Sequence, residues 1–431
     1  MKKTITTLIA LLVTIGINAQ TLEWAKSFGG ANEDYGYSIT VDALGNVYTT
    51  GHFQDTVDFD PGAGTTNLSS NGFNDVFVQK MDPQGNLLWA KSFGGTSNEY
   101  CNSITVDASG NIYTTGHFEG TVDFDPGAGT TNLSSNGNND VFVQKMNSSG
   151  NLLWAKSFGG TNVDRGYAIT VDASGNIYTT GHFQDTVDFD PGAGTTNLSS
   201  NGFADVFVQK MDLSGNFLWA KSFGGTSNEY CNSITVDASG NVYTTGRFRV
   251  TVDFDPGAGT TNLSSNGSDD VFVQKMDQQG NLLWAKSFGG SSVEIGRSIT
   301  VDASGNVYTT GHFQDTVDFD PGAGTTNLSS NGGADFFVQK MSQLNTGVIE
   351  NNFEHKLTVY PNPTSGNFSI DLGAVYEASI VSITDISGKL IESKTITQSQ
   401  VLNLSIKEPA GIYIVSIQTG NKKATIGLVK E

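Results

Sequence analysis

The heptapeptide WAKSFGG occurs five times in this chain of 431 residues, and its first copy spans residues 24–30. The copies begin at Trp24, Trp89, Trp154, Trp219 and Trp284, which are 65 residues apart. A second heptapeptide, DVFVQKM, keeps the same spacing from Asp75 onward and ends as the variant DFFVQKM at Asp335. A fixed period of this length, unbroken by insertions, indicates one supersecondary unit per repeat, each stacked on its neighbours.

Each repeat predicts four β-strands and no helix. In the first full unit the expected strands are residues 38–42, 47–53, 75–81 and 87–93. These stretches are rich in β-branched and aromatic residues and alternate between apolar and polar positions. Tight turns rich in Gly and Asn join the first two and the last two strands, and the long connection between the pairs has room for a short hairpin. Four antiparallel strands per repeat are typical of a β-propeller blade.

The motif ITVDxxGNVYTTG at residues 39–51 resembles the bacterial β-propeller repeat family that is named for seven blades. The resemblance covers residues 24–341, and we expect an all-β fold with a five-bladed β-propeller of 65-residue four-stranded blades over residues 20–341. The chain begins with a lone fourth strand at residues 22–28, and the last repeat lacks its fourth. We therefore expect the N-terminal strand to close the ring. An open β-solenoid and a ring completed by a second chain are the alternatives.

The composition changes after a polar linker at residues 342–355. Short alternating segments between Gly, Pro and Asn turns predict a small C-terminal β-sandwich at residues 356–431. This domain resembles the type A C-terminal sorting domain of the type IX secretion system. The matching residues are Tyr360, Pro361, Asn362, Pro363, Gly366, Asp385, Gly388, Lys389, Gly411, Ile412 and Tyr413.

The resemblance to the sorting domain implies a destination and a partner. It implies export across the outer membrane of a Bacteroidetes-type bacterium by the type IX secretion machinery. It also implies removal of the domain, followed by release or by attachment to surface polysaccharide. The alternative is a sandwich that serves as a binding module.

Residues 1–19 have the pattern of a secretory signal peptide. Lys2 and Lys3 precede an apolar stretch at residues 8–17, and cleavage is expected between Ala19 and Gln20. A buried N-terminal helix is the alternative. No stretch approaches the roughly 20 apolar residues that a transmembrane helix needs, so we expect no transmembrane segment.

The charge balance bears on partners. The net charge is −20, and the acidic excess lies in the repeats, because seven Lys balance seven Asp and Glu from Phe353 onward. Such a surface disfavours nucleic acid and anionic lipid. It suits simple solvation, cation binding or a basic partner.

The two cysteines, Cys101 and Cys231, occupy the same position two repeats apart. Equivalent positions in non-adjacent blades do not approach to disulfide distance, so we expect free buried thiols.

Candidate ligand contacts come from the segment that joins one blade to the next, which varies most between repeats. Loops on a rigid scaffold are where binding residues usually lie, although neutral drift in surface loops explains the variation equally well. The candidates are Glu33, Asp34, Tyr35, Glu99, Tyr100, Asp164, Arg165, Glu229, Tyr230, Glu294 and Arg297.

The invariant loop DFDPGAG offers two carboxylates per repeat, followed by a glycine-rich turn. Such oxygens suit Ca²⁺, which takes six to eight of them, and calcium is the one cofactor we consider. The loop lacks the closing Glu of a twelve-residue calcium loop, and an ordinary turn is the alternative. The candidate ligands are Asp58, Asp60, Asp123, Asp125, Asp188, Asp190, Asp253, Asp255, Asp318 and Asp320.

Two other repeated residue types have structural interpretations. Trp89 and its copies are expected in the core between blades, with an exposed platform for sugar stacking as the alternative. One strand position carries His in four repeats and Arg247 in the fifth. One His per blade does not bring metal ligands together unless the position lines the ring axis, so we interpret these as ordinary strand residues.

These features favour a secreted or surface-attached binding or adhesion protein without catalytic activity. Five near-identical units suit a scaffold or multivalent binding better than a unique catalytic role, and a glycan or an extracellular protein is the expected ligand. An extracellular polysaccharide hydrolase or lyase is one alternative, and it would show acidic residues in only some blades. A structural surface or matrix protein is the other.

Overall fold

The protein was analysed as a computed structural model. The structure describes residues 21–322, 324–342, 348–351, 353, 357–385, 388–420 and 422–431. The expected signal peptide, residues 1–19, lies outside these ranges. All regular elements are strands, and they form two compact units that meet in sequence at Lys340 and Met341. In the described parts of the chain, no helix has the length and apolar character to cross a membrane.

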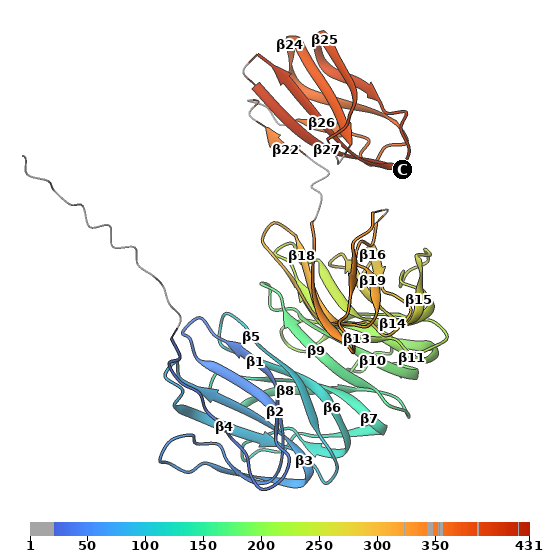
Figure 1. The fold of residues 1–431 in the computed structure, drawn as a ribbon. Coiled ribbons are helices and arrows are strands. Elements are labelled where there is room, and N and C mark those ends of the chain that lie inside the picture. Colours follow the sequence, from blue (N-terminus) through green and yellow to red (C-terminus); the bar gives the residue numbers. More distant parts are fainter. Residues whose placement is uncertain are drawn as a thin grey trace, which may run out of the picture. The chain divides into compact units, whose positions relative to one another are not determined.

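The first unit contains five blades of antiparallel strands that follow one another along the chain (Figure 1). The first strands of the sheets are β1 (Tyr35–Val41), β5 (Tyr100–Val106), β9 (Arg165–Val171), β13 (Tyr230–Val236) and β17 (Ile295–Val301). The second strands are β2 (Val47–Asp58), β6 (Ile112–Asp123), β10 (Ile177–Asp188), β14 (Val242–Asp253) and β18 (Val307–Phe313). The third strands are β3 (Asn67–Met81), β7 (Asn132–Met146), β11 (Asn197–Met211), β15 (Asn262–Met276) and β21 (Asp335–Met341). The fourth strands are β4 (Leu87–Phe93), β8 (Leu152–Phe158), β12 (Phe217–Phe223) and β16 (Leu282–Phe288).

The second and third strands are longer than the sequence indicates. In the first blade, Thr56–Asp58 pairs with Asn67–Ser69, so the expected loop carries a hairpin that extends the sheet. A bulge interrupts the pairing between Gln54 and Thr56, where Asp55 has a φ of 58°. In the last blade this extension is a separate pair, β19 (Thr316–Asp318) and β20 (Asn327–Ser329).

The hydrophobic core lies between blades. Val76 and Val78 of the first blade pack with Cys101 and Ile104 of the second, and all four are at most 4% exposed. The first strands of successive blades lie beside one another, from β1 through to β17. Stacked blades with a core at each junction are a propeller-like arrangement, and the predicted all-β fold class with four strands per repeat is confirmed.

Trp89 makes a contact between blades, as predicted. Its indole Nε1 donates to the carbonyl of Ser148 in the next blade at 3.2 Å. Its ring lies close to Gly150, whose φ of 76° is a conformation that a side chain rarely adopts. Cys101 and Cys231 are buried and form no disulfide, which confirms the prediction of free thiols.

The ring closure expected from the N-terminal strand is not present. The last sheet has three strands, β17-β18-β21, and residues 21–30 form no strand. Trp24 donates instead to the carbonyl of Pro83 at 3.0 Å, so this segment contacts the first blade in the way that Trp89 contacts the second. Neither terminal face is covered by another blade. Ile39 is 67% exposed, and Phe336 and Val338 are 81% and 70% exposed.

The second unit is a β-domain with a single core. Its strands are β22 (Val348–Asn351), β23 (Thr358–Tyr360), β24 (Asn367–Asp385), β25 (Leu390–Ser405), β26 (Gly411–Thr419) and β27 (Lys422–Lys430). They form one hydrogen-bonded sheet in the order β22-β27-β26-β24-β23, with β25 paired to β24. Residues of β24 to β27, including Ile370 and Val415, are buried together, so this unit is a β-domain with its own core.

The uncovered first face predicts unequal mutational costs at equivalent positions. Ile104→Ala removes a side chain that is 4% exposed, and we expect it to lower the free energy of unfolding by about 3 kcal/mol. Ile39→Ala, at the same position in the first blade, should cost well under about 1 kcal/mol. Denaturant unfolding of the two variants compares them directly. Equal losses would mean that the first face is covered in solution.

A second stability prediction concerns Val250, a β-branched residue with a φ of 59°. Three other repeats carry Asp at this position with the same backbone conformation, which Asp tolerates better. Val250→Asp should therefore raise the free energy of unfolding by about 1 kcal/mol. Val250→Thr keeps the branched carbon and should give no gain in thermal unfolding. A gain with Thr would show that strain is not the cause.

Candidate functional site

The first strand of each blade contributes two side chains to one side of the strand. In the first blade these are Tyr35 and Tyr37, which stack on each other and both contact His52 of the second strand. The two residues are alternate positions of one strand and so share a side, and the pairing with β2 shifts register between Gly36 and Ser38. Most of the remaining strand is invariant, whereas these two positions differ between repeats. In chain order the pairs are Tyr35 and Tyr37, Tyr100 and Asn102, Arg165 and Tyr167, Tyr230 and Asn232, and Ile295 and Arg297.

A pocket of about 520 Å³ lies between the first strands of four blades. We call it the arginine pocket, and its lining residues are Asn102, Arg165, Tyr167, Tyr230, Asn232, Arg247, Ile295 and Arg297. Ile295 is the one lining side chain without a polar group, and no lining residue is acidic. The pocket therefore presents mainly hydrogen-bond donors and positive charge.

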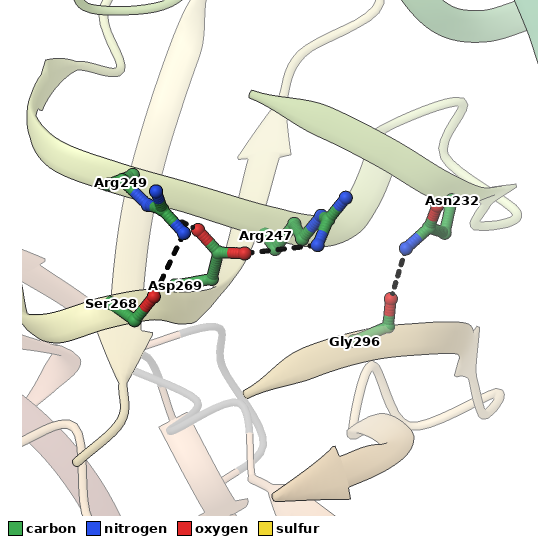
Figure 2. Close-up of polar contacts among 6 residues, drawn as sticks. All are labelled: Asn232, Arg247, Arg249, Ser268, Asp269 and Gly296. Atoms are coloured by element: carbon green, nitrogen blue, oxygen red, sulfur yellow. Dashed lines mark hydrogen bonds and ion pairs between the residues drawn. The ribbon is translucent and has the colours of Figure 1, made fainter. Parts of the chain in front are cut away.

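Arg247 belongs to a cluster found in the fourth blade alone. Asp269 lies between two guanidinium groups, with Arg247 Nη1 at 3.0 Å and Arg249 Nε at 2.9 Å (Figure 2). The Arg249 group also donates to Ser268 Oγ at 2.9 Å, and Arg247 stacks over the Tyr230 ring at 4.6 Å. One carboxylate thus orients two arginines and compensates the charge of only one.

The asparagines of the pocket hold neighbouring blades together. Asn232 Nδ2 donates to the Gly296 carbonyl of the next first strand at 2.8 Å (Figure 2). Asn102 makes the same bond to Gly166 at 2.7 Å. These bonds fix the backbone of β9 and β17 next to Arg165 and Arg297.

Arg247 replaces a histidine that is neutral in the other blades. Burial, and then the charge of Arg165, lower the pKa of both His117 and His182 to about 3. His52 is also buried, and burial lowers its pKa as well. A guanidinium keeps its charge at any physiological pH, so Arg247 adds a permanent positive charge that the other copies lack.

Four of the six acidic residues among the predicted ligand contacts face inward. Glu99, Asp164, Glu229 and Glu294 are fully buried. Each accepts a hydrogen bond from a backbone amide of the preceding glycine pair, as Glu99 does from Gly95 at 2.8 Å. Burial raises the pKa of Glu99 and Glu229 to about 7 and that of Asp164 to about 6. These carboxylates hold the segment that joins one blade to the next.

The remaining candidates lie in the pocket, between the first two blades, or on the uncovered side of the first blade. Arg165, Tyr230 and Arg297 line the pocket. Tyr100 packs between His52 and His117, and its hydroxyl accepts a hydrogen bond from Asn74. The corresponding residues of the first blade, Glu33, Asp34 and Tyr35, lie on its uncovered side and are exposed or half-buried.

Sequence reasoning missed five pocket residues: Asn102, Tyr167, Asn232, Arg247 and Ile295. The first strand was expected to begin at residue 38, whereas it begins at Tyr35, so the second variable position was placed outside the strand. Arg247 joins the pocket because it lies opposite Tyr230 in the register of β13 and β14. Its difference from the four histidines was the one available signal.

The proposed calcium loops are closed by their own carboxylates. Asp58 Oδ1 accepts hydrogen bonds from the amides of Thr66 at 2.8 Å and Asp60 at 3.0 Å, and these bonds lower its pKa. Asp60 Oδ1 accepts from the amide of Gly62 at 2.8 Å. The other four loops repeat this pattern. Within the described residues, no three His, Cys, Asp or Glu side chains converge as a metal site requires.

The sorting-motif residues stabilise turns and edges of the second unit. Asn362 binds the last strand twice, through its Nδ2 to the Gly427 carbonyl at 3.0 Å and through its Oδ1 from the Val429 amide at 2.9 Å. Asp385 closes the hairpin to β25 by accepting from the Lys389 amide at 3.0 Å. The Tyr413 hydroxyl donates to the Pro409 carbonyl at 2.7 Å.

Comparison with protein families identifies both parts of the chain. A model described as a beta-propeller repeat matches residues 23–52, 88–117, 153–182, 218–247 and 283–312. A model described as a secretion system C-terminal sorting domain matches residues 358–431. The chain thus carries five β-propeller repeats and a type IX sorting domain, as the sequence motifs indicated. This sorting domain marks the chain for secretion to the extracellular space or the cell surface.

Individual relatives are distant. An uncharacterized WD repeat-containing protein, L264, of Acanthamoeba polyphaga mimivirus is 24% identical over 76% of this chain and 27% of its own length. The regulatory protein FlaEY of Caulobacter vibrioides is 24% identical over 51% of this chain and 23% of its own. The chain therefore spans about a quarter of these relatives. A solved structure of a protein of unknown function from Bacteroides caccae matches over 79% of this chain and 98% of that chain, at 11% identity and a TM-score of 0.31.

The buried carboxylates predict a pH dependence of stability. Burial raises the pKa of Glu99 from 4.5 to about 7, so the folded state retains a proton that the unfolded chain loses in this range. The stability contributed by Glu99 is complete below about pH 4.5 and falls as the pH rises toward 7. Glu99→Gln should therefore raise the free energy of unfolding by about 2 kcal/mol at about pH 8, with little change at about pH 5.

The matched control is Asp34→Asn, the equivalent position in the first blade, where the carboxylate is half-buried. Thermal unfolding of both variants at the two pH values makes the comparison. A gain in Glu99→Gln that is the same at both pH values would contradict the assigned titration.

Proposed function

We propose that this protein is an exported, non-catalytic binding protein that takes its ligand in the arginine pocket. The observation that carries the proposal is the asymmetry of the pocket within a nearly symmetric scaffold. The repeats share most of their core and turn residues, yet the two variable first-strand positions and the single His-to-Arg replacement meet in one place. Export by the type IX route would bring this pocket to ligands outside the cell.

The residues around the pocket favour binding over hydrolysis. Glycoside hydrolysis uses a pair of carboxylates on either side of the bond, and the pocket lining supplies none. Asp269, the nearest side chain of that kind in the cluster, is held by two arginines and is 9% exposed. Eliminative cleavage needs a base, and a tyrosine acts as one only when its phenol has lost its proton. Burial raises the pKa of Tyr167, so this phenol stays protonated.

The test is a binding screen of the full-length protein against extracellular glycans and proteins. We expect saturable binding that is lost in the double variant Arg165→Tyr, Arg297→Asn. Both replacements are residues that other repeats carry at the same positions, so the fold should tolerate them. Lys156→Gln removes one charge from the outer strand β8 and should leave binding intact.

The same screen separates the alternatives. Binding should be indifferent to a calcium chelator, because backbone amides already satisfy the loop carboxylates. Absence of saturable binding, with self-association of the protein, would favour a structural role. Product formation from any polysaccharide, lost in the double variant, would replace binding with catalysis.

A further inference from the structure

We infer that the arginine pocket recognises an acidic sugar through its carboxylate or sulfate group. The inference rests on the proposed function and adds the chemical class of the ligand. Its starting point is the distribution of arginine. The chain has four arginines, and all of them lie in the third to fifth repeats. Three line the pocket, and the fourth, Arg249, is tied to it through Asp269.

The positive charge of the pocket is not balanced by the protein. Among the residues that the structure describes, the two ion pairs both use Asp269, so Arg165 and Arg297 form none. The Arg165 Nε is buried without a hydrogen-bond partner. In a chain with a net charge of −20, a local excess of guanidinium groups requires an explanation, and an anionic ligand supplies the missing partner.

Guanidinium groups suit oxyanions in particular. Their planar donors pair with the two oxygens of a carboxylate or sulfate, and Arg is preferred over Lys wherever such paired recognition matters. Arg247 is already oriented by Asp269 and by its stacking on Tyr230, so little side-chain freedom is lost on binding.

The rest of the lining indicates that the anion is carried by a hydroxylated ligand. Tyrosine and asparagine groups surround the arginines, and Ile295 is the one wholly apolar contact. The volume of about 520 Å³ lies in the range of sites for small molecules, which fits a short stretch of sugar rings rather than a folded domain.

The experiment measures affinity by calorimetry on the full-length protein with four probes. Oligogalacturonate supplies the carboxylate, its methyl ester removes the charge, a sulfated glucose oligomer supplies the sulfate, and a glutamate peptide is the non-sugar anion. We expect one of the two acidic sugars to bind at least about tenfold more tightly than the neutral ester and the peptide. Affinity should fall with added salt.

Matched variants assign the binding to the pocket. Arg165→Tyr, Arg297→Asn and Arg247→His each introduce a residue found at that position in another repeat, and each should weaken binding by about tenfold. Lys156→Gln should not. Preference for the carboxylate or the sulfate probe decides between the two sources of the anion.

The outcomes separate this inference from the proposed function. Equal binding of the ester and the acid, lost in the pocket variants, would overturn the anion assignment and leave the binding function intact. Preference for the glutamate peptide would overturn the sugar assignment. No pocket-dependent binding of these probes, or of any ligand in the wider screen, would overturn both.

Discussion

The structure depends on apolar contact between successive blades. A single four-stranded sheet has no core of its own, and residues such as Val78 are buried only because the next blade brings Ile104 against them. Stability in such an array is a sum over junctions, so the interior blades have two stabilising neighbours and the end blades have one. Ile39 and Val338 are exposed because each lies on the face of an end blade that has no further blade against it.

The same constraint explains where the repeats are free to differ. Residues at the junctions and in the tight turns recur in almost every copy, because each of them contacts the neighbouring copy. The inner side of the first strand faces no apolar partner, and there the five copies carry Tyr, Asn, Arg or Ile. The replacements that give the pocket its asymmetry therefore change side chains without changing the scaffold. The fourth blade departs furthest from the others. It alone carries Arg247, Arg249 and Asp269 at their positions, and its Val250 has a strained backbone conformation.

Much of this architecture can be predicted from local sequence. The period of 65 residues, the four strands and the hairpin turns follow from patterns that each repeat contains in full. The pocket could not be predicted in the same way, because it depends on where the first strands begin, at Tyr100, Arg165, Tyr230 and Ile295, and on the register that sets Arg247 opposite Tyr230. Ring closure was wrongly expected. The expectation rested on a lone N-terminal strand and a missing fourth strand in the last repeat, and the sequence does not give the angle between successive blades that decides whether these two meet. The buried state of Glu99 was equally invisible, since a charged residue in a variable loop suggests exposure.

The buried cysteines have a consequence for the life of the protein outside the cell. Burial raises the pKa of the thiols of Cys101 and Cys231 to about 12, so neither forms the thiolate that attacks disulfides or peroxides. The fold of the repeats contains no bond that a reductant could break and no reactive thiol that an oxidant could trap. Its integrity is thus independent of redox conditions, and its passage between compartments of different potential requires no partner that makes or rearranges disulfides.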